Sequence, residues 1–285
     1  MAAGHEATAM TSGEYIIHHL TPFNNIGKAQ ESIADFSVIN YDTIFFSLTI
    51  GLIGVYFMWR ATRNSTAGVP GRAQAAIELI ADIVHTQAAM IIPDKKALRT
   101  VVPLAMTVLV WIFLMNALDF LPLDLFPLIW QKLSGNPHAF LRGVPTADLN
   151  GTLGAAGGVL VLVFIFNCKT KGFWGWMHEM CSVPLGDNPL LYLPNFAMHL
   201  SEFASKTLSH GMRLYGNMYA GELLFIMIAL MGGAFTWSLG GYIAFVCHVI
   251  AGSAWAIFHI LIIGLQAFIF MMMALVYIGQ AHSHH

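Results

Sequence analysis

The fold is decided by a C-terminal stretch without a single Asp, Glu, Lys or Arg, residues 223–280, which reads LLFIMIALMGGAFTWSLGGYIAFVCHVIAGSAWAIFHILIIGLQAFIFMMMALVYIGQ. An uncharged apolar run of this length is typical of helices inside a lipid bilayer. Glycine pairs at 232–233 and 240–241 interrupt it and predict two helices, over 190–237 and 239–280. Helices of roughly 40 residues reach about 60 Å, so this pair must lie antiparallel and strongly tilted in a membrane core of about 30 Å. A division into three or four shorter spans stays open.

Three shorter apolar stretches come earlier in the chain. They predict spans at about 43–59, 101–118 and 151–167, each long enough to cross the hydrocarbon core. A further stretch at about 72–92 has apolar and polar residues at helical spacing, and because it is too polar to span, we expect it to lie at the membrane interface. The predicted fold class is an all-α integral membrane protein, with about five transmembrane helices and an interfacial helix in a single membrane domain over 42–285.

The composition agrees with this class and excludes several others. Of 285 residues, 57% are apolar and 10% are charged, against roughly 25% charged residues in an average soluble domain. The net charge of -2 leaves no basic excess to bind the phosphates of a nucleic acid. Three cysteines without CxxC spacing indicate neither a disulfide framework nor a cysteine-ligated metal site. Residues 1–40 lack the basic-then-apolar pattern of a signal peptide, so we expect the internal spans to direct membrane insertion.

Lysines and arginines near the spans predict the orientation, because cytoplasmic segments carry an excess of them. Only Lys28 precedes the first span, whereas the segment between the first two spans carries Arg60, Arg63, Arg72, Lys95, Lys96 and Arg99. The N-terminal segment 1–41 is therefore expected outside the cytoplasm, with the loop 119–150 on the same side. The third span then brings Lys169 and Lys171 to the cytoplasm, and two more spans leave the C-terminus there.

The predicted fourth span carries ionisable residues, which are costly inside a membrane unless they have a partner or contact water. Glu222 lies on the opposite side of the helix from Arg213 and nearer the outside, and His199 lies beside Glu202 toward the cytoplasm. Arg213 has the weakest structural explanation, because an arginine keeps its charge at mid-membrane. Lys206 has a simpler one, as a side chain that reaches the cytoplasmic surface from a helix end. At about 100° per residue, one polar stripe is formed by Glu202, Lys206, Ser209, Arg213 and Asn217.

The predicted last span places His248, His259 and Gln266 on one face, because their separations are near-whole numbers of helical turns. Folding this span back on the fourth puts Gln266 near the depth of Arg213, and His259 near the depth of Glu222. Glu222 and His259 either line a proton path or form a buried structural pair. His248 fits an interhelical hydrogen bond better.

Two further polar positions have open interpretations. Asn116 and Asp119, at the outer end of the second span, could form the mouth of a polar path. The default interpretation of Asp119 and Asp124 is instead a solvated helix end. His210 has no role that the sequence supports.

The segment LSHGMRLYGNMYAGE, residues 208–222, closely resembles the arginine-bearing segment of one family, subunit a of the membrane sector of rotary ATP synthases. Resemblance covers the chain from about Tyr15 and is greatest to proteobacterial forms. Four more segments resemble bacterial members in the same order: INYDTIFFS (39–47), FLMNALDFLPLDL (113–125), VPTADLN (144–150) and WAIFHILIIGLQAFIFM (255–271).

The resemblance implies roles for individual residues. Arg213 matches the family's essential arginine, which faces the carboxylates of a rotating ring of c subunits. Asn217 and Gln266 match polar residues beside that arginine. Glu222 and His259 match a pair that is proposed to line the proton path open to the outer compartment.

At the mouth of the outer path this chain agrees with the family, whereas on the cytoplasmic path it differs. Asn116 and Asp119 match residues near the outer mouth. Many bacterial relatives carry a glutamate where this chain has His199, and Glu202 stands one turn later, so the residue on the cytoplasmic path stays open between the two. His210 replaces an apolar residue of the family.

The function implied by the resemblance is that of the stationary proton-translocating subunit of an ATP synthase, in which an arginine separates two offset half-channels to the c-ring. The implied partners are the c-subunit ring, the b-subunit peripheral stalk, the rest of the F-type ATP synthase, lipid and protons, in the bacterial inner membrane. No cofactor, metal or enzymatic activity of its own is implied. Two other classes stay open: a haem-bearing electron carrier, suggested by 13 histidines, and a secondary transporter built from inverted repeats. The first three spans lack histidine and the halves show no repeat, which argues against both.

Overall fold

The computed structural model describes residues 13, 23–27, 37–66, 68–122, 125–135, 141–186, 188–233 and 236–282. Within these residues the elements are helical, and an isolated β-bridge joins Asn24 to Asn40. Five of the helices are long and apolar enough to cross a membrane, which confirms the predicted class of all-α integral membrane protein. Most of the N-terminal segment 1–41, including Lys28, falls outside the described residues, as does Asp124.

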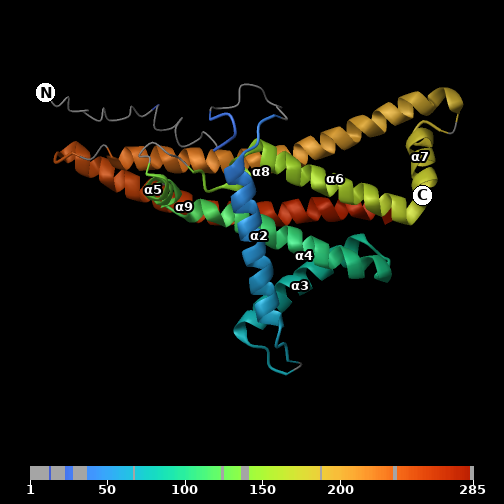
Figure 1. Ribbon diagram of the computed structural model, residues 1–285, viewed down its shortest axis with the longest axis horizontal. Coiled ribbons are helices and arrows are strands. Elements are labelled where there is room, and N and C mark those ends of the chain that lie inside the picture. The colour runs from blue at the N-terminus through green and yellow to red at the C-terminus, as the bar shows by residue number, and fades with distance from the viewer. Residues whose placement is uncertain are drawn as a thin grey trace.

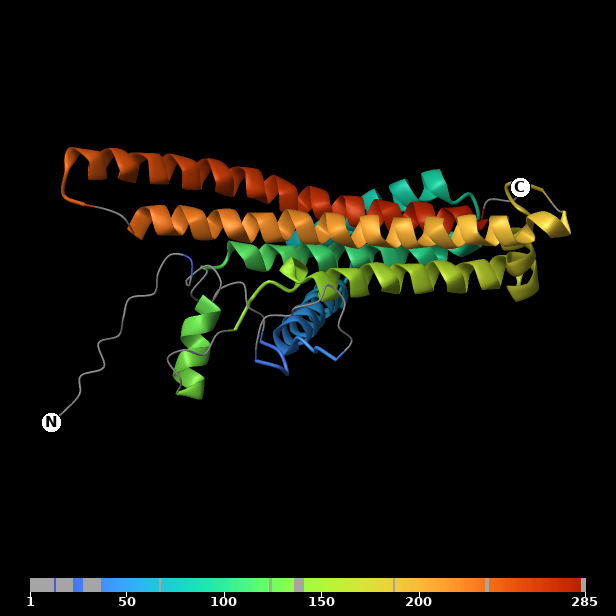
Figure 2. The ribbon, with the colours of Figure 1, turned by 90° about the horizontal axis from the view of Figure 1, so that it is seen from above.

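The two longest helices, α8 (Tyr192–Gly233) and α9 (Leu239–His282), contain 42 and 44 residues and run antiparallel side by side (Figure 1, Figure 2). The long pair is as predicted, and the alternative of three or four shorter spans is wrong. Ser238 lies at the start of α9, where its hydroxyl oxygen accepts a hydrogen bond from the amide of Gly241 at 3.1 Å. A 3-10 helix, η3 (Pro189–Leu191), leads into α8.

The helices α4 (Lys95–Ala117) and α6 (Leu149–Lys171) lie along this pair, α4 against α9 and α6 against α8 (Figure 1). Gly211 permits the second contact, because a Cβ there would lie 3.2 Å from the backbone oxygen of Thr152. The core fixes the relative depth of residues on these helices and so positions the polar groups described below. Its fully buried side chains include Ile112, Leu214, Met218, Ile263, Met271 and Leu275.

A fifth helix, α2 (Tyr41–Thr62), crosses the others at a steep angle, and α3 (Arg72–Ile91) folds back beside α4 (Figure 1). Only 11% of the apolar window of α2 is buried, so most of its surface is open to lipid or to another protein. The steep crossing means that α2 and α8 cannot both stand upright in one membrane, which agrees with a strong tilt of the long pair. α3 is not one of the five helices apolar enough to span.

Polar contacts tie α2 to the rest of the bundle. The carboxylate of Asp148 accepts hydrogen bonds from the side-chain amide of Asn40 at 2.8 Å and from the hydroxyl of Thr43 at 2.7 Å. Further along the helix, the indole N–H of Trp111 donates to the backbone oxygen of Ser47 at 2.9 Å. The contacts of Asp148 hold the first turn of α2 against the start of α6, and the contact of Trp111 holds its second turn against α4.

The helices run beyond the apolar residues from which the spans are predicted. α4 begins at Lys95, because the carboxylate of Asp94 accepts hydrogen bonds from the amides of Lys96 and Ala97 and caps its first turn. α6 continues to Lys171, where basic residues interact favourably with the helix dipole. Hydrophobicity marks the part that suits lipid, whereas caps and backbone hydrogen bonds set the ends of a helix.

Two short helices, α5 (Leu125–Ser134) and α7 (Phe173–Ser182), are missed by the sequence analysis. α5 lies in the segment expected only as an outer loop, together with the 3-10 turns η1 (Leu118–Phe120) and η2 (Pro145–Ala147). Helices of this length are marginal on their own. Aromatic contacts to α2 and α6 support them, and such tertiary contacts leave no local sequence pattern.

Candidate functional site

Ionisable and amide side chains gather in two groups along the α8–α9 pair, with Arg213 between them. The turn-side group lies nearer the α8–α9 turn, and all of its members are buried: Asn116, Asp119, Arg142, Glu222 and His259. The end-side group lies nearer the opposite ends of the two helices and consists of His199, Glu202, Lys206 and Gln280.

His259 and Asp119 form the most enclosed pair of the turn-side group. Nε2 of His259 lies 2.6 Å from Oδ2 of Asp119, within ion-pair distance, and both side chains are almost fully buried. The rings of Phe120, Phe225 and Trp255 surround the imidazole. Asp119 lies on the 3-10 turn η1 after α4, from which its carboxylate reaches α9. The interpretation of Asp119 as a solvated helix end is therefore wrong.

Gly221 provides the space for this imidazole. A Cβ at Gly221 would overlap with Cε1 of His259 and would lie 3.4 Å from Oδ2 of Asp119. At Gly232 a Cβ would lie 2.8 Å from the ring of His248 in the same way. The polar residues predicted on one face of the last span thus do face α8, and glycines on α8 accommodate the two imidazoles.

Glu222 is paired with Arg142. Its Oε2 lies 3.4 Å from Nη2 of Arg142, and each side chain is 6% exposed. Arg142 comes from the segment before η2 and also donates a hydrogen bond to the backbone oxygen of Ala147. Because a charge buried to this extent needs a partner, Arg142 explains how Glu222 can lie inside the bundle. The sequence analysis missed this role, although an arginine among apolar neighbours, in LRGVP, was a signal.

A small cavity joins the two pairs of the turn-side group. Asp119, Arg142 and Glu222 line a cavity of about 20 Å³, and a water needs roughly 10–15 Å³. Asn116 lies three residues before Asp119 and is fully buried, and its amide has no hydrogen-bond partner among the described residues. An unsatisfied amide costs about 1–3 kcal/mol unless water reaches it. The turn-side group is therefore suited to hold water between its carboxylates.

Arg213 lies on α8 and is partly exposed. Among the residues that the structure describes, none forms a hydrogen bond or an ion pair with its guanidinium. One turn later, the side-chain amide of Asn217 donates a hydrogen bond to Oε1 of Gln266 at 2.7 Å, which places Gln266 near the depth of Arg213 as predicted. An arginine in a membrane helix is costly unless it has a partner or contacts water.

The end-side group is linked by polar contacts and reaches solvent. Nζ of Lys206 lies 2.6 Å from Oε1 of Glu202 and donates a hydrogen bond to Oε1 of Gln280 at 2.9 Å. His199 lies 3.7 Å from Glu202 through Nδ1 and 3.1 Å from the backbone oxygen of Val183 through Nε2. These side chains line a cavity of about 110 Å³, and that of Glu202 is 51% exposed. Lys206 is held by its partners rather than extended alone toward the surface.

The fold and these two groups define a multi-pass helical membrane protein with ionisable residues inside its bundle. Within the described part of the chain, no cluster of three or more His, Cys, Asp or Glu side chains is arranged to hold a metal ion.

Comparison with known proteins places this chain in one family. It matches the family described as ATP synthase A chain over residues 44–279. It is 53% identical to the ATP synthase subunit a of an Acidovorax species and 52% identical to that of Paracidovorax citrulli, in each case over 98% of this chain and 99% of the relative. The corresponding protein of Verminephrobacter eiseniae is 50% identical over the same shares. The chain therefore belongs to the family of ATP synthase subunit a, of the Fo sector, and its resemblance to proteobacterial members is confirmed.

Proposed function

We propose that this chain is the stationary proton-translocating subunit of an F-type ATP synthase, and that it exchanges protons with the carboxylates of a rotating c-subunit ring. The observation that carries the proposal is the position of Arg213 between two separate polar groups on one helix pair, where no described residue forms a hydrogen bond or an ion pair with it. A proton-driven rotor needs two half-paths that do not join, one from each side of the membrane. The chain supplies these paths and binds no nucleotide itself.

The turn-side group is suited to the half-path from the outer compartment. Asp119 and Glu222 line one cavity with room for a water, and His259 lies 2.6 Å from Asp119. Carboxylate and imidazole side chains both accept and release protons, so protons can pass between them at short range or through a water. Asn116, with its unpaired amide, can bind water beside Asp119. In this scheme Glu222 and His259 do not contact each other directly, and Asp119 passes protons between them.

Arg213 keeps the half-paths apart, because a guanidinium does not release its proton. A lysine would serve less well, since burial can neutralise it. At about 4 Å and an effective dielectric constant near 20, a ring carboxylate and the arginine attract each other by roughly 4 kcal/mol. The membrane potential supplies about 2.3 kcal/mol per proton per 100 mV, which is of the same order. The ring carboxylate is therefore held in its charged form yet can move on.

The end-side group is suited to the cytoplasmic half-path. His199 and Glu202 lie 3.7 Å apart and line a cavity of about 110 Å³, in which several waters fit. Each can exchange protons with this water, and Lys206 holds Glu202 in place. Both residues are therefore assigned to this path.

The proposed placement follows the positive-inside rule. The chain lies in a bacterial inner membrane, with its N-terminus outside the cytoplasm and its C-terminus inside. The spans are at about 43–59, 101–118, 151–167, 190–237 and 239–280, and the interfacial helix is at about 72–92. The relatives are named as subunits of ATP synthase. We extend this assembly to the present chain, with the c-ring, the b-subunit stalk and the rest of the F-type complex as partners.

The test is ATP-driven acidification of inverted membrane vesicles that contain the assembled complex. Arg213→Ala and Glu222→Gln are both expected to abolish pumping, the first because the half-paths lose their divider and the second because the outer path loses a titratable group. Arg99→Ala, at an exposed arginine of the first turns of α4, is the matched control and should pump normally. Normal pumping by an assembled Arg213→Ala complex would remove the proposal.

A further inference from the structure

His210 has a position on α8 that neither polar group explains, three residues before Arg213. Its side chain is 3% exposed and lies against the ring of Phe270, with the ring centroids 3.8 Å apart. Its Nε2 is buried and has no hydrogen-bond partner among the described residues. A buried nitrogen without a partner is costly unless water or another proton donor reaches it.

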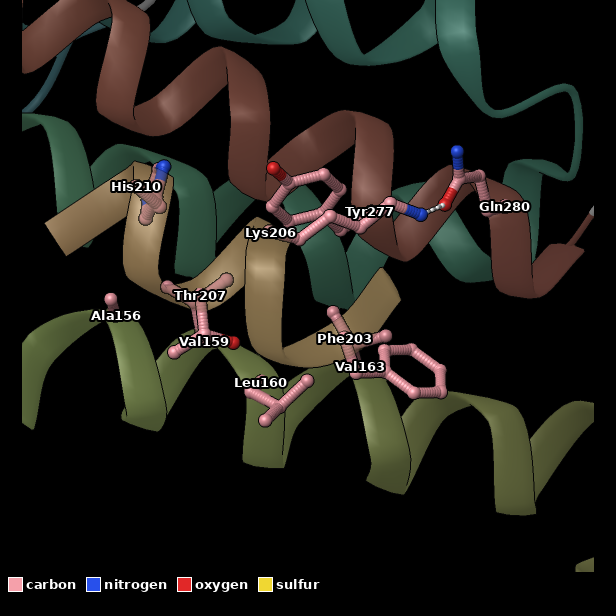
Figure 3. Close-up of a pocket in the computed structure, with 10 residues that line it drawn as sticks. All are labelled: Ala156, Val159, Leu160, Val163, Phe203, Lys206, Thr207, His210, Tyr277 and Gln280. Carbon is pink, nitrogen blue, oxygen red and sulfur yellow. Dashed lines mark hydrogen bonds between the residues drawn. The ribbon is translucent and has the colours of Figure 1, made fainter. Parts of the chain in front are cut away.

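A cavity lies beside this histidine. His210 lines a space of about 20 Å³ between α6, α8 and α9, together with Lys206, Tyr277 and Gln280 (Figure 3). Since a water needs roughly 10–15 Å³, one water fits there. Figure 3 shows His210 at one end of this row of side chains and Gln280, hydrogen-bonded to Lys206, at the other.

This small cavity adjoins the larger cavity of the end-side group. The larger one, of about 110 Å³, is also lined by His199 and Glu202, and the side chain of Glu202 is 51% exposed at the surface of the chain. A row of polar side chains thus leads from this surface past Glu202 and Lys206 to His210. The residues that line both cavities are Val163, Phe203, Lys206, Tyr277 and Gln280.

Few ionisable groups lie close to His210. On its own helix the neighbouring ionisable groups are Lys206 and Arg213, and α9 presents Tyr277 with ring centroids 6.0 Å away. The part of α6 that lines the cavity presents only apolar side chains. His210 therefore lies on α8 between Arg213 and the end-side group. Imidazole is the side chain that gains and loses a proton most readily near neutral pH.

We propose that His210 is a proton-exchange residue at the inner end of the cytoplasmic half-path, an inference that rests on the proposed function. During synthesis, a carboxylic acid of the c-ring that has approached Arg213 gives up its proton, and the neutral imidazole of His210 accepts it through an intervening water. The carboxylate remains opposite the arginine. The imidazolium then returns one proton to the cavity water, from which it passes to Glu202 or His199 and into the cytoplasm. No electrons are exchanged, and the reverse order applies during pumping.

The experiment measures passive proton conduction, driven by a potassium diffusion potential, in inverted vesicles from which the catalytic sector has been stripped. His210→Gln keeps a polar side chain of similar size that does not titrate. Its conduction is expected to fall by about 10- to 100-fold and to lose the pH dependence that a titrating imidazole confers. Imidazole added to the buffer is expected to restore part of the conduction, which a packing role would not allow. His248→Gln, at a histidine of α9 outside both groups, is the matched control and should conduct like the wild type.

The outcomes separate this inference from the proposed function. If His210→Gln conducts like the wild type, with the same pH profile, the inference is overturned, while loss of pumping in Arg213→Ala would still support the proposed function. If Arg213→Ala also pumps normally, both fail. Should His210→Gln fail to assemble, His210→Asn is measured in its place. If neither variant assembles, His210 is a packing residue and the inference is overturned as well.

Discussion

The turn-side and end-side groups lie on the same two helices, yet they hold their charges in opposite ways. In the turn-side group, Glu222 and Arg142 are each 6% exposed, and His259 is fully buried. In the end-side group, the side chains of Glu202 and Lys206 are 51% and 25% exposed and border a cavity of about 110 Å³. The difference shows that burial, more than residue type, decides how strongly a charge depends on its partner.

Elements outside the long pair create this difference. The turn-side charges are enclosed because the turn η1 and the segment before η2 bring Asp119 and Arg142 against α8 and α9. At the other end, α7 and the end of α6 leave the cavity of the end-side group open. The first group is therefore expected to be rigid and sensitive to substitution, and the second tolerant.

The largest effect on stability is predicted for Arg142→Met. The substitution leaves the carboxylate of Glu222 buried without its partner, which costs about 3–5 kcal/mol. The purified chain in lipid nanodiscs should then unfold at a clearly lower temperature than the wild type. The double variant Arg142→Met with Glu222→Gln is the control, and it should regain most of the loss because no charge remains unpaired. A wild-type unfolding temperature for Arg142→Met would show that Glu222 does not depend on this arginine.

An intermediate effect is predicted for Gly221→Ala. Its Cβ would overlap with Cε1 of His259, whose ring is fully buried and has no free space to move into. Overpacking of this kind costs about 1–3 kcal/mol, and moving the ring would also lengthen its contact with Asp119. Gly216→Ala is the matched control on the same helix, because a Cβ there meets nothing within 4 Å. Equal unfolding temperatures for the two variants would contradict the close contact at Gly221.

Helix geometry explains which parts of this arrangement could be predicted from the sequence. The uncharged stretch and its two glycine pairs were sufficient for the long antiparallel helices, because hydrophobicity and chain length fix both. Counting residues from the turn also placed Gln266 near Arg213, and the structure brings Gln266 to Asn217. Within a helix, depth and face follow directly from sequence number.

The partners of the buried charges could not be predicted in the same way. Arg142 lies in a non-helical segment, where no periodicity relates sequence number to position, and its partner Glu222 lies far from it in the sequence. Asp119 follows the end of α4, so its burial depends on the turn η1 and on the packing of α9. The sequence paired Glu222 with His259 by depth and by the family resemblance. In the structure, two residues outside the long helices, Asp119 and Arg142, provide the contacts instead.

The smallest effect is predicted for Lys206→Met in the end-side group. The ion pair of Lys206 with Glu202 is short, at 2.6 Å, but the carboxylate is half exposed and water replaces the lost contact. Exposed pairs of this kind contribute about 0–1 kcal/mol, so the unfolding temperature should change little. Added salt should reduce even this difference, because it screens exposed charges much more than buried ones. If Lys206→Met lowers the unfolding temperature as much as Arg142→Met does, the two groups are equally dry, and the open water path on the cytoplasmic side has to be abandoned.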